Sequence, residues 1–531
     1  MKIRFIGAAH EVTGSATLLS VGDENYLIDC GMEQGIDVFE NAPLPVIASE
    51  IDAVFLTHAH IDHSGMLPKL YKDGFRGKIY STAETANLCS IMLRDSAHIQ
   101  ELEAEWQSRK SERAGEGKVA PVYTTEDAVK TLELFRPAKY GEEIRISEYA
   151  TIRFTDVGHL LGSAAIEVWL SEGGVSRKIV FSGDVGNKNQ PIIKDPSFVE
   201  EADFVVIEST YGNRLHEKPG DTTAELAKYI KRAFDRGGNV VIPSFAVGRT
   251  QEILYAIREI KLRGLVNGLA DFPVYVDSPL AAEATGIFLQ CDTDCLDEET
   301  TALVKAGINP IWAEGLTLSI TAEDSKAINE NKTPKVIISS SGMCEAGRIR
   351  HHLKHNLWRE ESVILFVGYQ SEGSLGRYIQ NGAKKVKLFG EEIIVRAEIA
   401  TLHGTSGHAD RDGLISWLSG FKTKPQTVFI NHGDDEACKA FERLLNEMGY
   451  TTETPFSGTE YDLASSKMTI FADAKRIEKM ISGGKRARAI HDELCLVAEE
   501  LLRLAKNRKG APNKENAKLI SQIKSLISKW K

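Results

Sequence analysis

The spacing of apolar residues divides the chain into two regions with different predicted architectures. The first region contains short apolar runs bounded by Gly, Asp and Asn, a pattern that predicts β-strands. These runs lie at residues 2–7, 16–21, 25–30, 53–57, 151–157, 164–170 and 178–183. The sequence SEGGVS at 171–176 predicts a hairpin between the last two runs. Charged stretches at about 84–113 and 125–135 have a helical pattern.

After about residue 208, apolar strands alternate with amphipathic helices. NVVIPSF (239–245) leads into TQEILYAIREI, and KVIISSS (335–341) leads into RIRHHLKHNL. Repetition of strand and helix is typical of a parallel sheet covered by helices. Strands return after about residue 382 and end in TVFINHG, and a largely helical extension is expected beyond residue 463.

A length of 531 residues is too great for one ordinary hydrophobic core and predicts two or three domains. No apolar run is long enough to span a bilayer, and the first residues lack the apolar stretch of a secretion signal. The seven cysteines are odd in number and scattered, which disfavours a disulfide framework. We therefore expect a cytoplasmic protein without membrane contact.

HAHIDH at residues 58–63 places three histidines and one aspartate within six residues, directly after an apolar run. Residues two apart in an extended segment point the same way, so His58 and His60 can face one metal ion. Asp62 and His63 follow where the chain turns into a helical pattern, and they can face a second ion. Imidazole and carboxylate ligands suit zinc, with manganese or iron as alternatives.

Six residues do not complete two metal sites, and further ligands are expected at other strand ends. The candidates are His159 in VGHLLGSA, Asp184 in FSGDVG and His432 in INHGDD. Each follows an apolar run and adjoins small residues, where a loop can leave a polar side chain in a cleft. A lone His or Asp at such a place is usually structural, but the four segments together favour a metal centre.

HxHxDH followed by a later GH, a later SGD and a final His resembles the ligand pattern of the metallo-β-lactamase fold hydrolases. The resemblance implies two zinc ions per chain, with Mn²⁺ or another divalent ion as the alternative. The implied ligands are His58, His60 and His159 for one ion, Asp62, His63 and His432 for the other, and Asp184 as the bridge. Asp29, in the early LIDCG segment, fits a residue that orients ligands rather than a ligand.

Five further segments resemble the β-CASP nucleases, a branch of that fold that includes RNase J. They are ESTYG (208–212), SSSGMCEAGR (339–348), GYQSEGSLGR (368–377), SGHAD (406–410) and NHG (431–433). The resemblance covers about residues 1–460. RNA-acting members carry His at the last of these motifs, whereas DNA-acting members tend to carry Val, so His432 favours RNA.

The resemblance implies an α/β fold class: a metallo-β-lactamase αββα sandwich with an inserted β-CASP domain, whose parallel sheet is flanked by helices, and a helical C-terminal extension. The implied boundaries are 1–208 and 382–462 for the two parts of the sandwich, 209–381 for the insert and 463–531 for the basic extension.

The implied activity is zinc-dependent hydrolysis of phosphodiester bonds in single-stranded RNA, as an endonuclease, a 5′-exonuclease or both, in RNA processing or decay. His408 is the candidate general acid for the leaving oxygen, and Glu208 would hold its imidazole and favour the charged form. Asp62 and Asp184 are expected to take part in catalysis through the metal ions.

Gly/Ser-rich loops at helix starts offer backbone N–H groups that can hold phosphates. The candidate RNA contacts in or beside these loops are Arg249, Ser341, Arg348, Gln370, Ser374 and Arg377. Tyr211 and Tyr369 can stack on bases, with buried packing as the alternative for each.

The formal net charge of −11 is unevenly distributed. Residues 475–531 contain 15 Lys/Arg and 6 Asp/Glu, so this tail carries +9 and the rest of the chain −20. Helical spacing in the tail joins Leu494, Val497, Leu501 and Leu504. We expect this stripe to pack on the body or on another subunit, as in a homodimer, and the alternative is that the basic residues tether RNA.

Three other functions are weighed against the ribonuclease. A DNA nuclease of the same family is disfavoured by His432. A small-molecule hydrolase on the same fold is disfavoured by the insert, because a small ester does not need an added domain through which a nucleic-acid strand can pass. An RNA-binding scaffold without metals is disfavoured by the complete ligand set.

Overall fold

The computed structural model describes residues 1–35, 38–113, 117–217, 220–266, 271–371, 373–402, 406–477, 501 and 513–529. Residues 1–475 form one compact unit, and residues 476–531 form another. The second unit contains helix α15 (Asn513–Lys529). None of the described helices is both long enough and apolar enough to cross a membrane.

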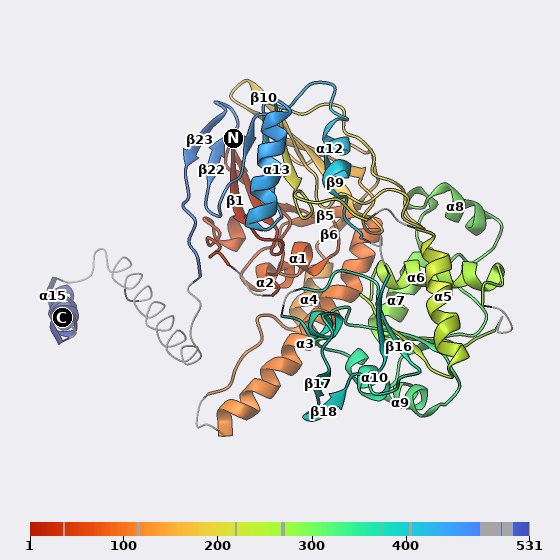
Figure 1. Ribbon diagram of the computed structural model, residues 1–531. Coiled ribbons are helices and arrows are strands. Elements are labelled where there is room, and N and C mark those ends of the chain that lie inside the picture. Colours follow the sequence, from red (N-terminus) through yellow and green to blue (C-terminus); the bar gives the residue numbers. More distant parts are fainter. Residues whose placement is uncertain are drawn as a thin grey trace. The chain divides into compact units, whose positions relative to one another are not determined.

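Two sheets packed face to face form the first domain (Figure 1). The strands of the first sheet are β1 (Lys2–Gly7), β2 (Ala16–Val21), β3 (Glu24–Ile28), β4 (Ala53–Phe55), β5 (Lys78–Thr82), β6 (Phe135–Ala138), β22 (Glu460–Asp462) and β23 (Lys467–Ile470). The strands of the second are β7 (Ile144–Arg145), β8 (Ala150–Asp156), β9 (Ala164–Glu172), β10 (Val175–Phe181), β11 (Phe204–Glu208), β20 (Thr427–Asn431) and β21 (Thr452–Glu453). Their orders are β23–β22–β1–β2–β3–β4–β5–β6 and β21–β20–β11–β10–β9–β8–β7.

Large apolar side chains fill the space between the two sheets. Phe5 of the first sheet contacts Phe429 of the second, with ring centroids 5.2 Å apart, and Phe204 packs beside them. Successive residues of a strand point to opposite faces, so each inward position is buried while its neighbours meet the helices outside. The sandwich therefore has one core between its sheets and a second layer beneath the outer helices.

Helices cover the outer faces of the sandwich. They are α1 (Ile61–Ser64), α2 (Leu67–Lys72), α3 (Ala83–Arg113), α4 (Thr125–Leu132), α12 (Arg411–Leu418) and α13 (Asp435–Glu447), with a short 3-10 turn at Ala48–Glu50. α3 and α4 confirm the helical stretches predicted near 84–113 and 125–135. The predicted hairpin is also present, because β9 and β10 pair across a turn in which Gly173 and Gly174 have positive φ.

The insert is a parallel sheet covered by helices (Figure 1). Its strands are β12 (Val240–Pro243), β13 (Val274–Asp277), β14 (Leu316–Ser319), β15 (Val336–Ser339), β16 (Val363–Phe366) and β19 (Glu398–Thr401), in the order β14–β13–β15–β12–β16–β19. Its helices are α5 (Thr222–Asp235), α6 (Arg249–Leu262), α7 (Pro279–Gln290), α8 (Glu298–Lys305), α9 (Ala322–Glu330), α10 (Ile349–Asn356) and α11 (Leu375–Gln380), with a 3-10 turn at Thr293–Cys295. The architecture confirms the predicted fold class.

Two strand pairings differ from the expected boundaries. β19 pairs in parallel with β16, so residues 398–401 belong to the sheet of the insert, which was expected to end at residue 381. The hairpin β17 (Lys385–Leu388) and β18 (Glu391–Ile394) lies between them in sequence. β23 pairs with β22 in the first sheet, so residues 467–470 are not part of a helical extension. Both are four-residue edge strands, and pairing with the existing sheet rather than a strong apolar pattern defines them.

The tail stripe falls almost entirely outside the described residues. Leu494, Val497 and Leu504 are not described, and neither is most of the basic segment at 485–510. Leu501 is described as helical. The packing expected for the stripe therefore stays a prediction.

Candidate metal centre

The predicted ligands converge because they follow strands that end at the same edge of the two sheets. β3 and β4 run parallel; Asp29 directly follows β3, and His58 lies three residues after the end of β4. β10, β11 and β20 also run parallel, and Asp184, Glu208 and His432 stand at their carboxyl ends. Loops leaving parallel strands at one edge carry polar side chains into a common crevice.

Three of these loop residues have left-handed backbone conformations, which are uncommon outside glycine. φ is +59° at Asp29, +66° at His159 and +51° at His432. Backbone hydrogen bonds hold two of them in place, from Asp29 N to Phe55 O (3.0 Å) and from His432 N to Ala8 O (2.8 Å). Strained residues of this kind persist where the surrounding structure fixes them, and they concentrate at functional sites.

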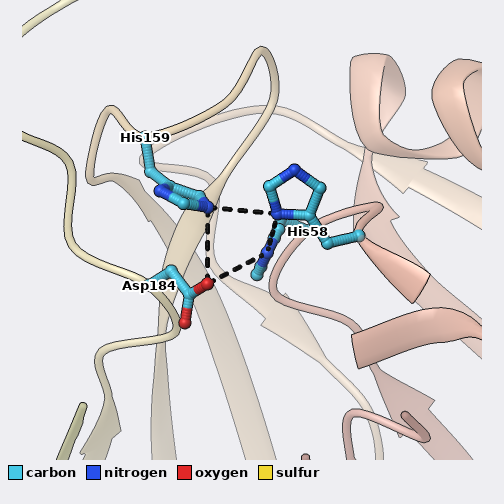
Figure 2. A group of neighbouring side chains, drawn as sticks. His58, His159 and Asp184 are labelled. Atoms are coloured by element: carbon cyan, nitrogen blue, oxygen red, sulfur yellow. Dashed lines mark hydrogen bonds and ion pairs between the residues drawn. The ribbon is translucent and has the colours of Figure 1, made fainter. Parts of the chain in front are cut away.

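The first cluster brings together one atom each of His58, His60, His159 and Asp184. His60 Nδ1 lies 3.0 Å from His58 Nε2 and 3.2 Å from His159 Nε2. Asp184 Oδ2 lies 3.4 Å from His58 Nε2 and 3.3 Å from His159 Nε2. Figure 2 shows the His159 and Asp184 side chains pointing toward each other and toward His58.

The second cluster contains Asp62, His63 and His432. His63 Nε2 is 2.9 Å from His432 Nε2, and Asp62 Oδ2 is 3.7 Å from the same His432 atom. The second oxygen of Asp184, Oδ1, lies 3.3 Å from His63 Nε2. One carboxylate therefore faces both clusters, with one oxygen toward each.

The donor atoms fit divalent metal ions. A tetrahedral site with metal–nitrogen bonds of about 2.0–2.1 Å has donor–donor edges of about 3.3 Å, close to the separations in the first cluster. Asp184 is buried, and its Oδ1 has no hydrogen-bond partner among the described residues. A buried carboxylate oxygen facing imidazole nitrogens and lacking a hydrogen bond is suited to a cation. The residues present therefore fit two metal ions that share Asp184.

The charge states of the histidines follow from burial and from their neighbours. Burial lowers the pKa of both His58 and His159 well below the usual value. Positive charge on a neighbouring ring lowers it further, from His63 in the case of His58 and from His408 in the case of His159. Burial also opposes charge on His63, but Asp184 and Asp29 outweigh it and raise the pKa of His63 well above the usual value. Neutral imidazoles offer the lone pairs that metal ions need, so protons and metal compete at His63.

Asp29 supports the second cluster without facing it. Its Oδ2 accepts a hydrogen bond from His63 Nδ1 at 2.7 Å, which leaves Nε2 directed at the cluster. Asp29 Oδ1 accepts from the backbone N–H of Thr57 (2.8 Å), and the Thr57 hydroxyl donates to the same carboxylate. Such outer contacts fix the tautomer and orientation of a metal-binding imidazole.

Glu208 and His408 form a pair beside Asp184. Glu208 Oε2 accepts from His408 Nδ1 at 3.1 Å, and its Oε1 accepts from the backbone N–H of Val185 at 2.6 Å. Burial disfavours charge on His408, but Glu208 and Asp184 outweigh it and raise the pKa of His408 to about 9. With Nδ1 held by Glu208, Nε2 is the nitrogen that can donate a proton to a substrate.

The segment that carries His408 is fixed to the segment that carries Asp184. Ala409 N donates to Val185 O at 2.7 Å, and Asn187 N donates to Gly407 O at 3.0 Å. These two bonds set the distance between His408 and the bridging carboxylate. Because the two segments are more than 200 residues apart in sequence, this relationship is a property of the tertiary structure.

The candidate RNA contacts are in several different environments. Arg249 pairs with Glu252, and Arg348 donates to the buried Asp277 at 2.7 Å. Gln370 is buried, and Ser374 accepts from Arg377 N at the start of α11. Ser341 Oγ lies 3.4 Å from Ala346 O. Their assignment to RNA stays a prediction, and only movement of the side chain would free Arg348 for a phosphate.

Two supporting residues were not found from the sequence. Thr57 precedes HAHIDH directly, and a hydroxyl beside a ligand cluster is a signal that could have been used. His216 Nε2 donates to His408 O (2.9 Å), and its backbone N–H donates to Asp410 at 3.1 Å. A single histidine in a polar stretch gives no sequence signal for this role.

Three family descriptions match successive parts of the chain. Residues 11–232 match the metallo-beta-lactamase superfamily, residues 250–379 the Beta-Casp domain, and residues 392–455 the Zn-dependent metallo-hydrolase RNA specificity domain. The first and last of these contain every predicted ligand. The third also overlaps β18 and β19, which pair outside the sandwich.

Curated proteins resemble the chain over most of its length. Ribonuclease TTHA0252 of Thermus thermophilus is 39% identical over 84% of this chain and 96% of its own. Transcription termination factor FttA of Methanosarcina mazei is 32% identical over 82% of this chain and 68% of its own. An RNase J-like protein of Methanocaldococcus jannaschii is 30% identical over 86% of this chain and 98% of its own.

Proposed function

The chain belongs to the metallo-β-lactamase superfamily and carries its β-CASP domain, and from this premise we propose that it is a zinc-dependent ribonuclease acting on single-stranded RNA. The observation that carries the proposal is the pair of donor clusters sharing Asp184, with His408 held beside them by Glu208. Relatives named as a ribonuclease and an RNase J-like protein support RNA as the substrate.

The residues that would hold two Zn²⁺ ions are His58, His60 and His159 on one side, Asp62, His63 and His432 on the other, and Asp184 between them. Bound there, the ions supply Lewis acidity at the phosphate and a nucleophile at neutral pH. Mn²⁺ is the alternative metal for the same donors. Burial of five of these seven side chains strengthens their electrostatic interactions.

His408 would protonate the leaving oxygen. Its pKa of about 9 keeps the imidazole protonated at neutral pH, and Glu208 on Nδ1 leaves Nε2 as the proton donor. A positioned general acid contributes about 10²–10⁴-fold to such a reaction. The products would be a 3′-hydroxyl and a 5′-phosphate, as the family resemblance implies.

The proposal includes a cytoplasmic location and a role in RNA processing or decay. Six described cysteines are free thiols, which suits a reducing compartment. The proposal leaves open whether the enzyme cuts internally or from the 5′ end, and whether it acts as a homodimer.

The experiment is cleavage of matched single-stranded substrates by the purified full chain. An internally labelled RNA is offered with a 5′-monophosphate, with a 5′-hydroxyl and as a circle, beside DNA of the same sequence. Asp184→Ala is the blank, and Asp73→Ala, at a surface aspartate paired with Lys69, is the matched control. Zinc is measured in each preparation.

We expect RNA cleavage by the wild-type protein and by Asp73→Ala, and none by Asp184→Ala. Cutting of the circle identifies an endonuclease, and mononucleotide release confined to 5′-monophosphate RNA identifies a 5′-exonuclease. Preferential cutting of DNA would replace the proposal with a DNA nuclease. A zinc-loaded protein that cuts neither would favour the small-molecule hydrolase.

A further inference from the structure

A positively charged side chain, Arg214, lies close to two aromatic rings from different halves of the compact unit. Its guanidinium carbon is 4.5 Å from the centroid of Tyr211 and 5.7 Å from the centroid of Tyr369. Tyr211 belongs to the loop after β11 in the sandwich, and Tyr369 to the loop after β16 in the insert. Guanidinium stacking on aromatic faces is favourable and keeps the planar group in a fixed orientation.

The charge of Arg214 has no protein counterpart in the described part of the chain. The side chain is exposed, and no described Asp or Glu forms an ion pair with it. The other arginines near the predicted substrate path differ, because Arg249 pairs with Glu252 and Arg348 with Asp277. No described residue accepts a hydrogen bond from this guanidinium, so its N–H donors are available to an anion.

The backbone of Arg214 is anchored to the segment of the proposed general acid. Arg411 N donates to Arg214 O at 3.1 Å, three residues after His408. The ring of Tyr211 is 6.1 Å from the ring of His408, centroid to centroid. These contacts place the backbone of Arg214 and the ring of Tyr211 beside His408, on the proposed leaving-group side of the site.

We propose that Arg214, in contact with Tyr211 and Tyr369, binds the RNA phosphate next to the scissile one on the leaving-group side. The inference rests on the proposed function and names a binding residue that it does not contain. A planar, always charged group with free in-plane donors suits a phosphate better than a lysine would. Because Tyr369 comes from the insert, its contact with Arg214 also joins the sandwich to the insert across the proposed path of the RNA.

The variants test separately the charge of Arg214, the planar shape of its guanidinium and the aromatic ring of Tyr369. Arg214→Met removes the charge, and Arg214→Lys keeps the charge but loses the planar fork. Tyr369→Phe keeps the stacking ring, and Tyr369→Ala removes it. Arg76→Met is the matched control: Arg76 stacks on Tyr71 at 4.0 Å, but it precedes the amino end of β5, at the edge of the sheet opposite the ligands.

The first readout is binding of a labelled single-stranded RNA at several salt concentrations, in an Asp184→Ala background that prevents cutting. Each phosphate neutralised contributes about 0.7 to the slope of log affinity against log salt for single strands. Arg214→Met is expected to lower the slope by about 0.7 and the affinity about tenfold at low salt. Arg214→Lys should keep the salt slope but bind RNA more weakly. Tyr369→Phe and Arg76→Met should have the same slope and affinity as Asp184→Ala alone. Tyr369→Ala should bind RNA more weakly.

The second readout is hydrolysis of bis(p-nitrophenyl) phosphate, a diester with no neighbouring phosphate, by variants with intact Asp184. Arg214→Met should hydrolyse it at the wild-type rate while its KM for RNA rises about tenfold. An unchanged salt slope in Arg214→Met, or an equal loss on both substrates, would overturn the assignment. A wild-type protein that neither binds nor cuts RNA would instead overturn the proposed function, so the two failures are distinguishable.

Discussion

At the scale of single residues, neighbouring charges decide which histidines hold protons. His58 and His159 are buried among other imidazoles, so they stay neutral and can offer lone pairs. His408 is also buried, but Glu208 and Asp184 hold its proton. The same ring is therefore suited to be a metal ligand at two positions and a proton donor at a third, and its surroundings set the difference.

The pH dependence of RNA cleavage should report His408. Its pKa is raised to about 9, so the protonated acid is present below that pH and cleavage falls as pH rises through it. Glu208→Gln removes the nearest negative charge, so the alkaline decline should move to lower pH. The measurement is kcat between pH 6 and pH 11 at saturating RNA, with Glu200→Gln as the control because that side chain pairs with Lys422 on the surface.

His408→Ala should lower kcat by about 10²–10⁴-fold and remove the alkaline decline, with zinc content unchanged. A decline that stays at the same pH in Glu208→Gln would contradict the assignment of this pair.

At the scale of elements, the loop after β3 packs backbone to backbone against the short helix α1. Cys30 N donates to His63 O at 2.8 Å, and Met32 N donates to Ile61 O at 2.9 Å. Gly31 lies between these bonds, and a Cβ added there would be 1.7 Å from Asp62 O. The close approach that only glycine allows therefore sets the position of two ligands.

Gly31→Ala should displace α1 and reduce metal binding. The new methyl meets backbone rather than a flexible side chain, and overpacking of this kind costs about 1–3 kcal/mol. We expect a lower thermal midpoint and less than two zinc ions per chain, measured by calorimetry and metal analysis. Gly117→Ala is the matched control, because a Cβ there meets nothing within 4 Å. Full zinc loading in Gly31→Ala would refute this role.

The element scale also separates strong sequence patterns from weak ones. α3 was predicted at about 84–113 and spans Ala83–Arg113, because a long charged stretch without Gly or Pro favours a helix locally. β19 and β23 were not predicted in their sheets, because four-residue edge strands carry little pattern of their own. For such strands the neighbouring strand supplies the hydrogen bonds that decide the structure.

At the scale of the whole molecule, the candidate metal centre is expected to contribute to stability. It joins loops from both sheets, so ions bound there would hold the two halves of the sandwich together. A ligand that binds only the folded state stabilises it by about 4 kcal/mol at a concentration 1,000 times its Kd.

Removing metal should therefore lower the thermal midpoint of the wild-type protein, and adding Zn²⁺ should restore it. The same titration should leave Asp184→Ala much less changed, because this variant lacks the oxygens that face both clusters. The measurement is thermal unfolding by circular dichroism across a Zn²⁺ series after chelation. Equal shifts in the two proteins would show that the stabilising ion binds elsewhere.

The sequence by itself determined the chemistry available to this protein. HAHIDH and the three strand-end residues indicated a candidate metal centre, and the change of period indicated short strands followed by a parallel sheet, because these signals are local. The family resemblance implied the sandwich. The tertiary structure decided which atoms meet. Asp184 serving both clusters, Glu208 on His408 and Arg214 under Tyr369 each join residues far apart in sequence. Such distances depend on how sheets pack, and no local pattern encodes them.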